Sequence, residues 1–319
     1  MTKTISIVVP CFNEEENIQH IYSTITGLFE GLENYHYEIL FIDNCSTDST
    51  QSLLRELTRK DPQIKVILNN RNFGIVRSPT HGMWEATGDA VVPIAADFQE
   101  PPHLIPEMIK KWEGGSKVVL AIRAGTSESR IKAFVRKQYY RIANSISEVP
   151  LVEQFNGYGL YDREVIDTIK DIGDPYPYFR GLVTEVGFDY STVQYEQPDR
   201  RRGVTSNNFY SLYDMAMNGL TSHSKVPLRL ISLLGLGSAV FSMLIAVIYF
   251  VYKLYHWDSF DVGIAPVVIG LFFFNSIILM ILGLLGEYIG FIHTRILNRP
   301  LVVEKERINF PDESEKQAS

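Results

Sequence analysis

Oxygen-bearing side chains follow two apolar runs within the first hundred residues. Asp43 ends the run YEILFID, and Asp97 and Gln99 stand two residues apart directly after the run VVPIAA. On an extended backbone, side chains two residues apart face the same side, so Asp97 and Gln99 are predicted to point together. A hard cation such as Mg²⁺ or Mn²⁺ binds one or two protein oxygens and completes its shell with phosphate oxygens and water. The pair therefore indicates a metal site that acts on a phosphorylated ligand.

Basic side chains gather in two later stretches. Six Arg and Lys residues lie between residues 123 and 141 against a single acid, Glu128, and residues 200–202 are three consecutive arginines. The planar guanidinium of Arg suits phosphate oxygens, although general attraction to anionic lipid headgroups would also account for such clusters. The whole chain carries a net charge of −7, which argues against a general nucleic-acid binder. We therefore expect a phosphate-bearing partner and no nucleic acid.

Histidine and cysteine indicate no further chemistry. The histidines show no spacing typical of a metal site, and His81 is expected on a helix face. Cys11 and Cys45 lie in apolar, strand-like segments, where buried thiols are common. Two cysteines cannot build a disulfide scaffold.

The chemically interesting residues stand at the ends of predicted strands. Apolar strand-like runs alternate with helix-like runs through the first 125 residues. The predicted strands are residues 5–10, 37–43, 64–69, 89–97 and 117–123, and the predicted helices are residues 15–29, 48–59, 78–86 and 103–112. Short helices near 160–169 and 178–186 and a strand near 188–196 follow. This order favours an α/β domain with a mostly parallel, doubly wound sheet, in which ligands bind at the carboxyl ends of the strands.

Two later runs carry no charged residue. Residues 230–252 and 262–286 are each long enough to cross a bilayer as a helix. Lys225 and Arg229 precede the first run, and Arg295 and Arg299 follow the second, so the positive-inside rule places the catalytic domain and both termini in the cytoplasm. The alternative is a pair of buried helices in a soluble core, for which such long uncharged runs are unusual.

These patterns predict four parts of the chain. Residues 1–206 form the α/β domain, and residues 207–228 form an amphipathic juxtamembrane segment. Residues 229–294 hold two transmembrane helices, and residues 295–319 form a cytoplasmic tail that is charged and frayed from Glu304. Two spans make a thin bundle, so a homo-oligomer that associates through the membrane is plausible.

Three strand-end motifs occur in the order typical of one family. VVPCFNEEENI, FIDNCSTDST and AADFQEPP resemble the nucleotide-sugar domain of glycosyltransferase family 2, which has the Rossmann-like GT-A fold. The second half, with NGYGLYDREVID, YFRGLVTEVGFD, YEQPDRRRGVTSNNF and SKVPLRLIS, resembles the polyprenyl-phosphate branch of that family. Two positions depart from the pattern: Ala95 and Gly157 stand where relatives carry acids.

The resemblance assigns expected roles to individual residues. Asp43 would accept a hydrogen bond from a uracil N–H or a ribose hydroxyl, whereas Asp48 is better explained as the cap of the next helix. Arg200 and Arg202 would close over the donor diphosphate, and Asp97 and Arg123 are the expected catalytic residues. The expected nucleotide-sugar residues are Pro10, Asn13, Glu14, Asp43, Arg77, Asp97, Arg200 and Arg202; the acceptor-phosphate residues are Arg123, Arg130, Arg136 and Ser206; the metal ligands are Asp97 and Gln99.

The function implied is inverting, metal-assisted transfer of one sugar from a nucleotide diphosphate to a polyprenyl phosphate at the cytoplasmic membrane face. UDP-glucose and undecaprenyl phosphate are the expected substrates, and Mg²⁺ or Mn²⁺ the cofactor. One alternative is a processive polysaccharide synthase, which would carry more spans and a Gln-x-x-Arg-Trp motif, whereas QYYRI lacks the Trp. Another is a non-catalytic membrane protein that retains the fold, which Ala95 favours.

Overall fold

The computed structural model describes residues 2–124, 152–198, 226–255, 264–297 and 299–311 of the 319-residue chain. Five of the residues to which the sequence analysis assigns a binding role lie outside these ranges, namely Arg130, Arg136, Arg200, Arg202 and Ser206. Residues 207–225, the larger part of the predicted juxtamembrane segment, also lie outside them.

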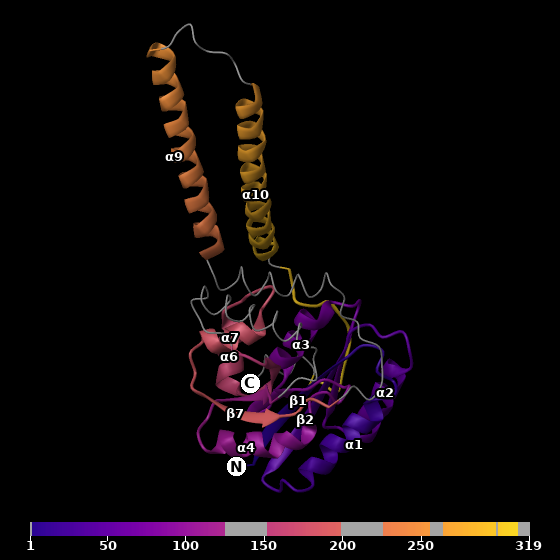
Figure 1. The fold of residues 1–319 in the computed structure, drawn as a ribbon. Coiled ribbons are helices and arrows are strands. Elements are labelled where there is room, and N and C mark those ends of the chain that lie inside the picture. Colours follow the sequence, from indigo (N-terminus) through magenta and orange to yellow (C-terminus); the bar gives the residue numbers. More distant parts are fainter. Residues whose placement is uncertain (1, 125–151, 199–225, 256–263, 298, 312–319) are drawn as a thin grey trace.

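In the described part of the chain, eight strands form one mixed sheet (Figure 1). They are β1 (Lys3–Cys11), β2 (Tyr35–Asp43), β3 (Ile64–Asn69), β4 (Ala90–Pro93), β5 (Val118–Arg123), β6 (Phe155–Asp162), β7 (Tyr190–Tyr195) and β8 (Glu304–Ile308). The spatial order is β7-β5-β6-β4-β1-β2-β3-β8. β1 pairs in parallel with β2 and β4, β2 with β3, and β5 with β7. The predicted parallel core is confirmed, and β6 runs antiparallel between β4 and β5.

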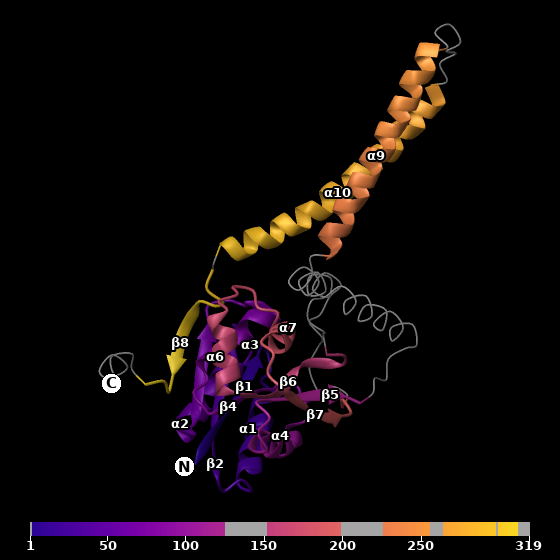
Figure 2. The ribbon, with the colours of Figure 1, turned by 90° about the vertical axis from the view of Figure 1, so that its left-hand side faces the viewer.

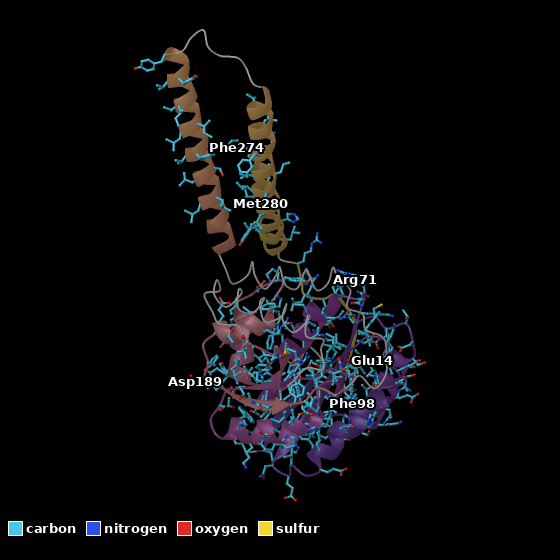
Figure 3. All side chains as sticks on the ribbon, viewed as in Figure 1. Glu14, Arg71, Phe98, Asp189, Phe274 and Met280 are labelled. Atoms are coloured by element: carbon cyan, nitrogen blue, oxygen red, sulfur yellow. The ribbon has the colours of Figure 1, made fainter. Side chains whose placement is uncertain are left out.

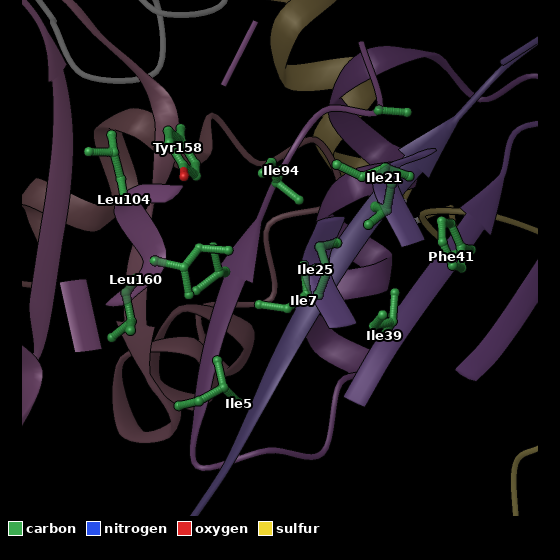
Figure 4. Close-up of a cluster of buried hydrophobic side chains, with 14 of the residues drawn as sticks. Ile5, Ile7, Ile21, Ile25, Ile39, Phe41, Ile94, Leu104, Tyr158 and Leu160 are labelled. Atoms are coloured by element: carbon green, nitrogen blue, oxygen red, sulfur yellow. The ribbon is translucent and has the colours of Figure 1, made fainter. Parts of the chain in front are cut away.

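Helices cover both faces of this sheet. Those described in the α/β domain are α1 (Ile18–Phe29), α2 (Thr50–Lys60), α3 (Gly74–Glu85), α4 (Ile105–Glu113), α6 (Arg163–Asp171) and α7 (Phe179–Glu185), with a 3₁₀ turn, η1 (Pro102–Leu104), before α4. Successive side chains of a strand point to opposite faces. Ile7 of β1 therefore packs with α1, α2 and α4, whereas its neighbour Val8 packs with α3, α6 and α7. Figure 4 shows part of the first of these two layers.

The helix α1 illustrates how the sequence forms these layers. Ile18, Ile21, Ile25 and Phe29 recur at helical spacing, and all four are buried against the sheet. Each such apolar side chain contributes roughly 1.5–3 kcal/mol when it is fully buried. The same face of the helix that the spacing predicts is the one that is buried.

The charged tail returns to the sheet, contrary to the expectation of a frayed end. β8 pairs antiparallel with the edge strand β3. Arg55 donates to both carboxylate oxygens of Glu306 at 2.6 Å, and Glu304 bonds His81 at 2.5 Å and also Arg307. The prediction is wrong for this segment because its alternating charges are paired with the domain rather than solvated.

Two long helices extend away from the α/β domain (Figure 2). They are α9 (Val226–Tyr255) and α10 (Ile264–Ile296), and they cover most of the two predicted spans. They contact each other where the side chain of Ile281 in α10 lies beside Gly235 of α9. Among the described residues, one stretch is long and apolar enough to cross a membrane, Phe273–Gly290 in α10, with a mean hydropathy of 1.7. Phe274 and Met280 of this stretch lie far from the α/β domain (Figure 3). That both helices cross a bilayer stays a prediction.

Candidate active site

The fully buried carboxylate of Asp43 ends β2 with one oxygen bonded and the other free of partners. Its Oδ2 accepts hydrogen bonds from the backbone N–H of Ser46 at 3.1 Å and from Nε2 of Gln51 at 2.7 Å. Its Oδ1 is buried and has no hydrogen-bond partner in the described part of the chain. A buried polar group without a partner costs roughly 1–3 kcal/mol. A ligand that donates to Oδ1 would recover this energy.

Hydrogen bonds join the loops that follow β1 and β2. The backbone N–H of Asn13 donates to Oγ of Ser46 at 2.9 Å, and Oδ1 of Asn13 accepts from the N–H of Thr47 at 2.8 Å. The N–H of Glu14 donates to Oγ1 of Thr50 at 2.9 Å. Asn13 adopts a φ of 56°, a left-handed conformation that Asn tolerates better than most residues. Asn13 and Glu14 thus hold the loops after β1 and β2 together next to Asp43. The side chain of Asn13 is occupied by its hydrogen bond to Thr47.

Asp48 lies just before α2 and bonds the start of that helix, although it is not the N-cap residue that the sequence predicts. Its carboxylate accepts from the N–H groups of Glu15 at 3.2 Å and Thr50 at 3.0 Å. Burial raises the pKa of Asp48, but these hydrogen bonds outweigh it and the pKa is lowered. The formal N-cap is Ser49, one residue later, and α1 begins at Ile18 rather than at Glu15.

A tight loop carries Asp97 and Gln99 at the carboxyl end of β4. Phe98 lies between them and has a φ of +61°. Its ring packs against that of His20, with the ring centroids 4.5 Å apart. The N–H of Gln99 turns back to Oδ1 of Asp97 at 3.1 Å. The backbone is therefore not extended here. The expectation that Asp97 and Gln99 face the same side assumed an extended backbone, and that assumption is wrong. Both residues remain at the strand end where the sequence places them.

A cavity of about 470 Å³ lies beside this loop, between the strand ends and the helices α3 and α7. Two of the residues expected in the site, Pro10 and Arg123, line it. Asp43, Asp97 and Gln99 are not among its lining residues. The expected site residues thus lie in two places, the joined loops next to Asp43 and a neighbouring cavity that Arg123 lines.

Glu100 lines this cavity and was not predicted from the sequence. Its Oε2 accepts from the backbone N–H of Ala95 at 2.7 Å, and its Oε1 accepts from Nδ2 of Asn156 at 2.6 Å. Burial raises the pKa of Glu100 to about 7, the charge of Asp97 adds to the rise, and the N–H of Ala95 and the charge of Arg123 act against it. The sequence feature that could have indicated Glu100 is an acidic residue directly before Pro-Pro, close to the end of a predicted strand.

Arg123 is held at the end of β5 by an aromatic partner. Its Nε donates to the hydroxyl of Tyr195 at 3.3 Å, and Tyr195 packs edge-on against Tyr158 with ring centroids 6.0 Å apart. Burial raises the pKa of Tyr195, while hydrogen bonds from Arg123 and Asn156 oppose the rise. The guanidinium thus approaches the cavity on a fixed aromatic support.

Arg77 and Gly157 fit the expected site less directly. Arg77 lies on α3 but is not among the cavity-lining residues, and its guanidinium donates to the carbonyl of Pro300. Gly157 lines the cavity with a φ of +108°, a conformation that side-chain-bearing residues rarely adopt. An acid at position 157 would require a different local backbone.

The described residues hold no cluster of three or more His, Cys, Asp and Glu side chains that would bind a metal by themselves. A metal here would be bound by Asp97 and Gln99 together with oxygens of a ligand. Cys11 and Cys45 are free thiols. The expected burial is confirmed for Cys11 and is wrong for Cys45, which follows the end of β2 and is partly exposed.

The chain is similar to known proteins over most of its length. Residues 6–170 match the family model described as glycosyl transferase family 2. The chain is 34% identical over 303 residues to the SfII prophage-derived bactoprenol glucosyl transferase of Shigella flexneri, covering 95% of this chain and 97% of that protein. It is also 34% identical over 310 residues to the prophage bactoprenol glucosyl transferase homolog of Escherichia coli K12, covering 94% of this chain and 98% of the relative.

A solved structure aligns with part of the chain. The mannosyltransferase PcManGT from Pyrobaculum calidifontis, in complex with GDP-Man and Mn²⁺, aligns with 72% of this chain and 65% of its own, at 16% identity and a TM-score of 0.46. The family match covers the strand ends described above, and the identity to the bactoprenol glucosyl transferases extends through α9 and α10. The chain therefore belongs to glycosyl transferase family 2, within its polyprenyl-phosphate glycosyltransferase branch.

Proposed function

We propose that this protein transfers a single hexose, glucose from UDP-glucose, to a polyprenyl phosphate at the cytoplasmic face of the membrane, with inversion at the anomeric carbon. The observation that carries the donor half is the unpartnered Oδ1 of Asp43. A uracil N–H or a ribose hydroxyl is a neutral donor of the kind that this buried oxygen lacks. Relatives named bactoprenol glucosyl transferase support glucose as the sugar and a bactoprenol-linked acceptor.

The loop after β4 has oxygen donors that fit a divalent metal on the donor diphosphate. Asp97 supplies a carboxylate and Gln99 an amide oxygen, which are ligands that Mg²⁺ and Mn²⁺ accept alongside phosphate oxygens. Ala95 removes the second acid of the family pattern, so the diphosphate would complete the shell. The metal would neutralise the charge that develops on the departing diphosphate.

Arg123 supports the acceptor half. Its guanidinium is fixed by Tyr195 beside the cavity, where a phosphate of the acceptor would be held. A phosphate monoester has a second pKa of about 6, so it is already largely dianionic at neutral pH and needs no strong general base. The absence of an acid at position 157 is compatible with this chemistry, because positioning and charge neutralisation would supply the rate enhancement.

The helices α9 and α10 fit a membrane anchor. Large apolar side chains such as Leu236 of α9 and Leu279 of α10 are 64% and 68% exposed, and long apolar surfaces of this kind need a non-aqueous environment. We propose that both helices cross the bilayer, with the α/β domain and both termini in the cytoplasm. This arrangement places a water-soluble donor next to a lipid acceptor.

A donor panel tests the proposal. Purified full-length protein in detergent would receive radiolabelled UDP-glucose, UDP-galactose, UDP-GlcNAc or GDP-mannose together with a short polyprenyl phosphate and Mg²⁺ or Mn²⁺. We expect organic-extractable label from UDP-glucose, none with EDTA, and none from the Asp97→Ala variant. A non-catalytic protein would give no lipid-linked label with any donor, and a processive synthase would give a polymer instead of a single-sugar lipid.

A further inference from the structure

Among the described residues, one carboxylate and two guanidinium groups line the cavity beside the β4 loop. Glu100 is the carboxylate, and Arg123 and Arg180 are the cations among the lining residues. The remaining wall is mostly apolar and includes Ile75, Ile94 and other side chains from α3, the strand ends and the segment before α7. A cavity of this kind suits a ligand that has an apolar face, hydroxyl groups and an anionic end.

The carboxylate of Glu100 is held in place by groups that leave it room for a ligand. Each oxygen already accepts one hydrogen bond, from Ala95 N–H and from Asn156 Nδ2. At pH 8, above the pKa of about 7 that burial gives Glu100, the ionised carboxylate has about four acceptor positions, so roughly two remain. Tyr158, whose hydroxyl donates to the carbonyl of Pro101 at 2.8 Å, secures the backbone directly after Glu100. The geometry of the carboxylate is therefore set before a ligand arrives.

The charged side chains of the cavity favour different parts of such a ligand at different positions. A phosphate next to Glu100 would meet like charge, whereas a neutral hydroxyl would donate to it. Arg123, which is held by Tyr195, lies near enough to Glu100 for its charge to act on that carboxyl, so a cation faces the same cavity. The cavity thus favours a hydroxylated ring near Glu100 and a phosphate near Arg123.

We propose that Glu100 accepts a hydrogen bond from a hydroxyl of the donor's hexose ring and thereby selects the sugar. This inference rests on the proposed function, because it assigns the hexose of the nucleotide sugar to this cavity. A volume of about 470 Å³ accommodates a hexose together with an acceptor phosphate. The anomeric carbon then lies between the departing diphosphate and a phosphate held by Arg123. Glu100 takes no part in bond making; it fixes the ring.

Binding measurements separate this role from a metal-binding or a structural one. Calorimetry on the full-length protein with Mn²⁺ would give the Kd of UDP and of UDP-glucose for the wild type, Glu100→Gln, Glu100→Asp and the exposed control Glu107→Gln. Loss of a charged hydrogen bond predicts that Glu100→Gln raises the Kd of UDP-glucose about tenfold or more while leaving that of UDP within about twofold. Glu100→Asp should be intermediate, and Glu107→Gln should match the wild type.

Deoxy analogues of UDP-glucose identify the hydroxyl. Removing the contacted hydroxyl should weaken binding to the wild type but not to Glu100→Gln, whereas removing any other hydroxyl should affect both proteins alike. An equal loss of UDP and UDP-glucose affinity in Glu100→Gln, or no change in either, overturns the proposal. If the wild type binds and transfers glucose while Glu100→Gln retains the wild-type ratio of the two affinities, only this inference fails. If the wild type binds no nucleotide sugar, the proposed function fails as well.

Discussion

Replacing Asp43 by asparagine should change which nucleotide the protein prefers. Both partners of Oδ2, the N–H of Ser46 and Nε2 of Gln51, are donors, so the amide oxygen of the substituted side chain must take that side. The NH₂ group is then forced to the position of the unpartnered Oδ1. A donor replaces an acceptor at the point where the ligand is expected, while the bonds that hold the loop are kept.

The magnitude follows from the bond that is lost. A hydrogen bond to a charged group contributes about 1.5–3 kcal/mol, so the Kd of UDP should rise about 10- to 150-fold. Uracil presents N3–H as a donor, whereas N3 of cytosine is an acceptor. If Asp43 contacts the base, Asp43→Asn should weaken UDP far more than CDP; if it contacts the ribose, both should weaken alike.

Calorimetric titration of the full-length protein with UDP and CDP checks this expectation. Asp89→Asn is the matched control, because Asp89 accepts the N–H of Thr4 at the opposite end of β4 from the site. An Asp43→Asn protein that melts like the wild type and binds UDP with unchanged affinity would refute the assignment of Oδ1 to the donor.

Other perturbations test separate parts of the structure. Asp97→Ala should reduce transfer to background in the lipid-product assay while the melting temperature stays near that of the wild type; substantial turnover would contradict the metal assignment. Arg123→Gln should raise the KM of the polyprenyl phosphate at least about tenfold, whereas Tyr195→Phe, which removes the hydroxyl that Arg123 bonds, should raise it a few-fold. An unchanged acceptor KM in both variants would place the phosphate elsewhere. Burial raises the pKa of Glu304, but hydrogen bonds from His81 and Arg307 outweigh burial and lower the pKa to about 2. The ionised carboxylate therefore stabilises the fold fully above pH 4.5, and this stabilisation is lost as the pH falls toward 2. Urea unfolding should therefore find Glu304→Gln less stable at pH 7 by at most about 3 kcal/mol, with the difference shrinking below pH 4.5; a constant difference would show that the charge of Glu304 is not its cause.

Local patterns were sufficient to predict the parallel part of the fold. The strands β1, β2 and β3 and the helices between them are continuous in sequence, and each buries a face whose spacing is visible in the residues themselves. The antiparallel insertion of β6 depends on a crossing from β5 that no periodicity encodes. The strand β8 was missed because Glu304 and Glu306 find partners on His81 and Arg55, more than 200 residues away, and alternating charges look solvated until those partners are known.

The candidate site was predicted in part. Asp43 and Arg123 stand at strand ends, which is where parallel sheets bind ligands, and the structure confirms these positions while their roles stay predictions. Glu100 could not be assigned because its place in the cavity depends on the left-handed turn at Phe98 and on Asn156, which is 56 residues away in the sequence. Arg77 is a residue to which the sequence assigned a role that its position does not favour. It lies on α3 near a motif, but it bonds Pro300 instead of lining the cavity.

In the proposed reaction, the phosphate of a membrane lipid attacks the sugar of a soluble nucleotide donor. The most direct measurement is NMR of the product formed from UDP-glucose and a short polyprenyl phosphate by the full-length protein, with the matching polyprenol as a parallel acceptor. We predict a glycosyl phosphate whose anomeric proton couples to phosphorus and whose configuration is opposite to that of the donor, with no product from the polyprenol. A product formed equally well from the polyprenol, or one that retains the donor's configuration, would contradict the account.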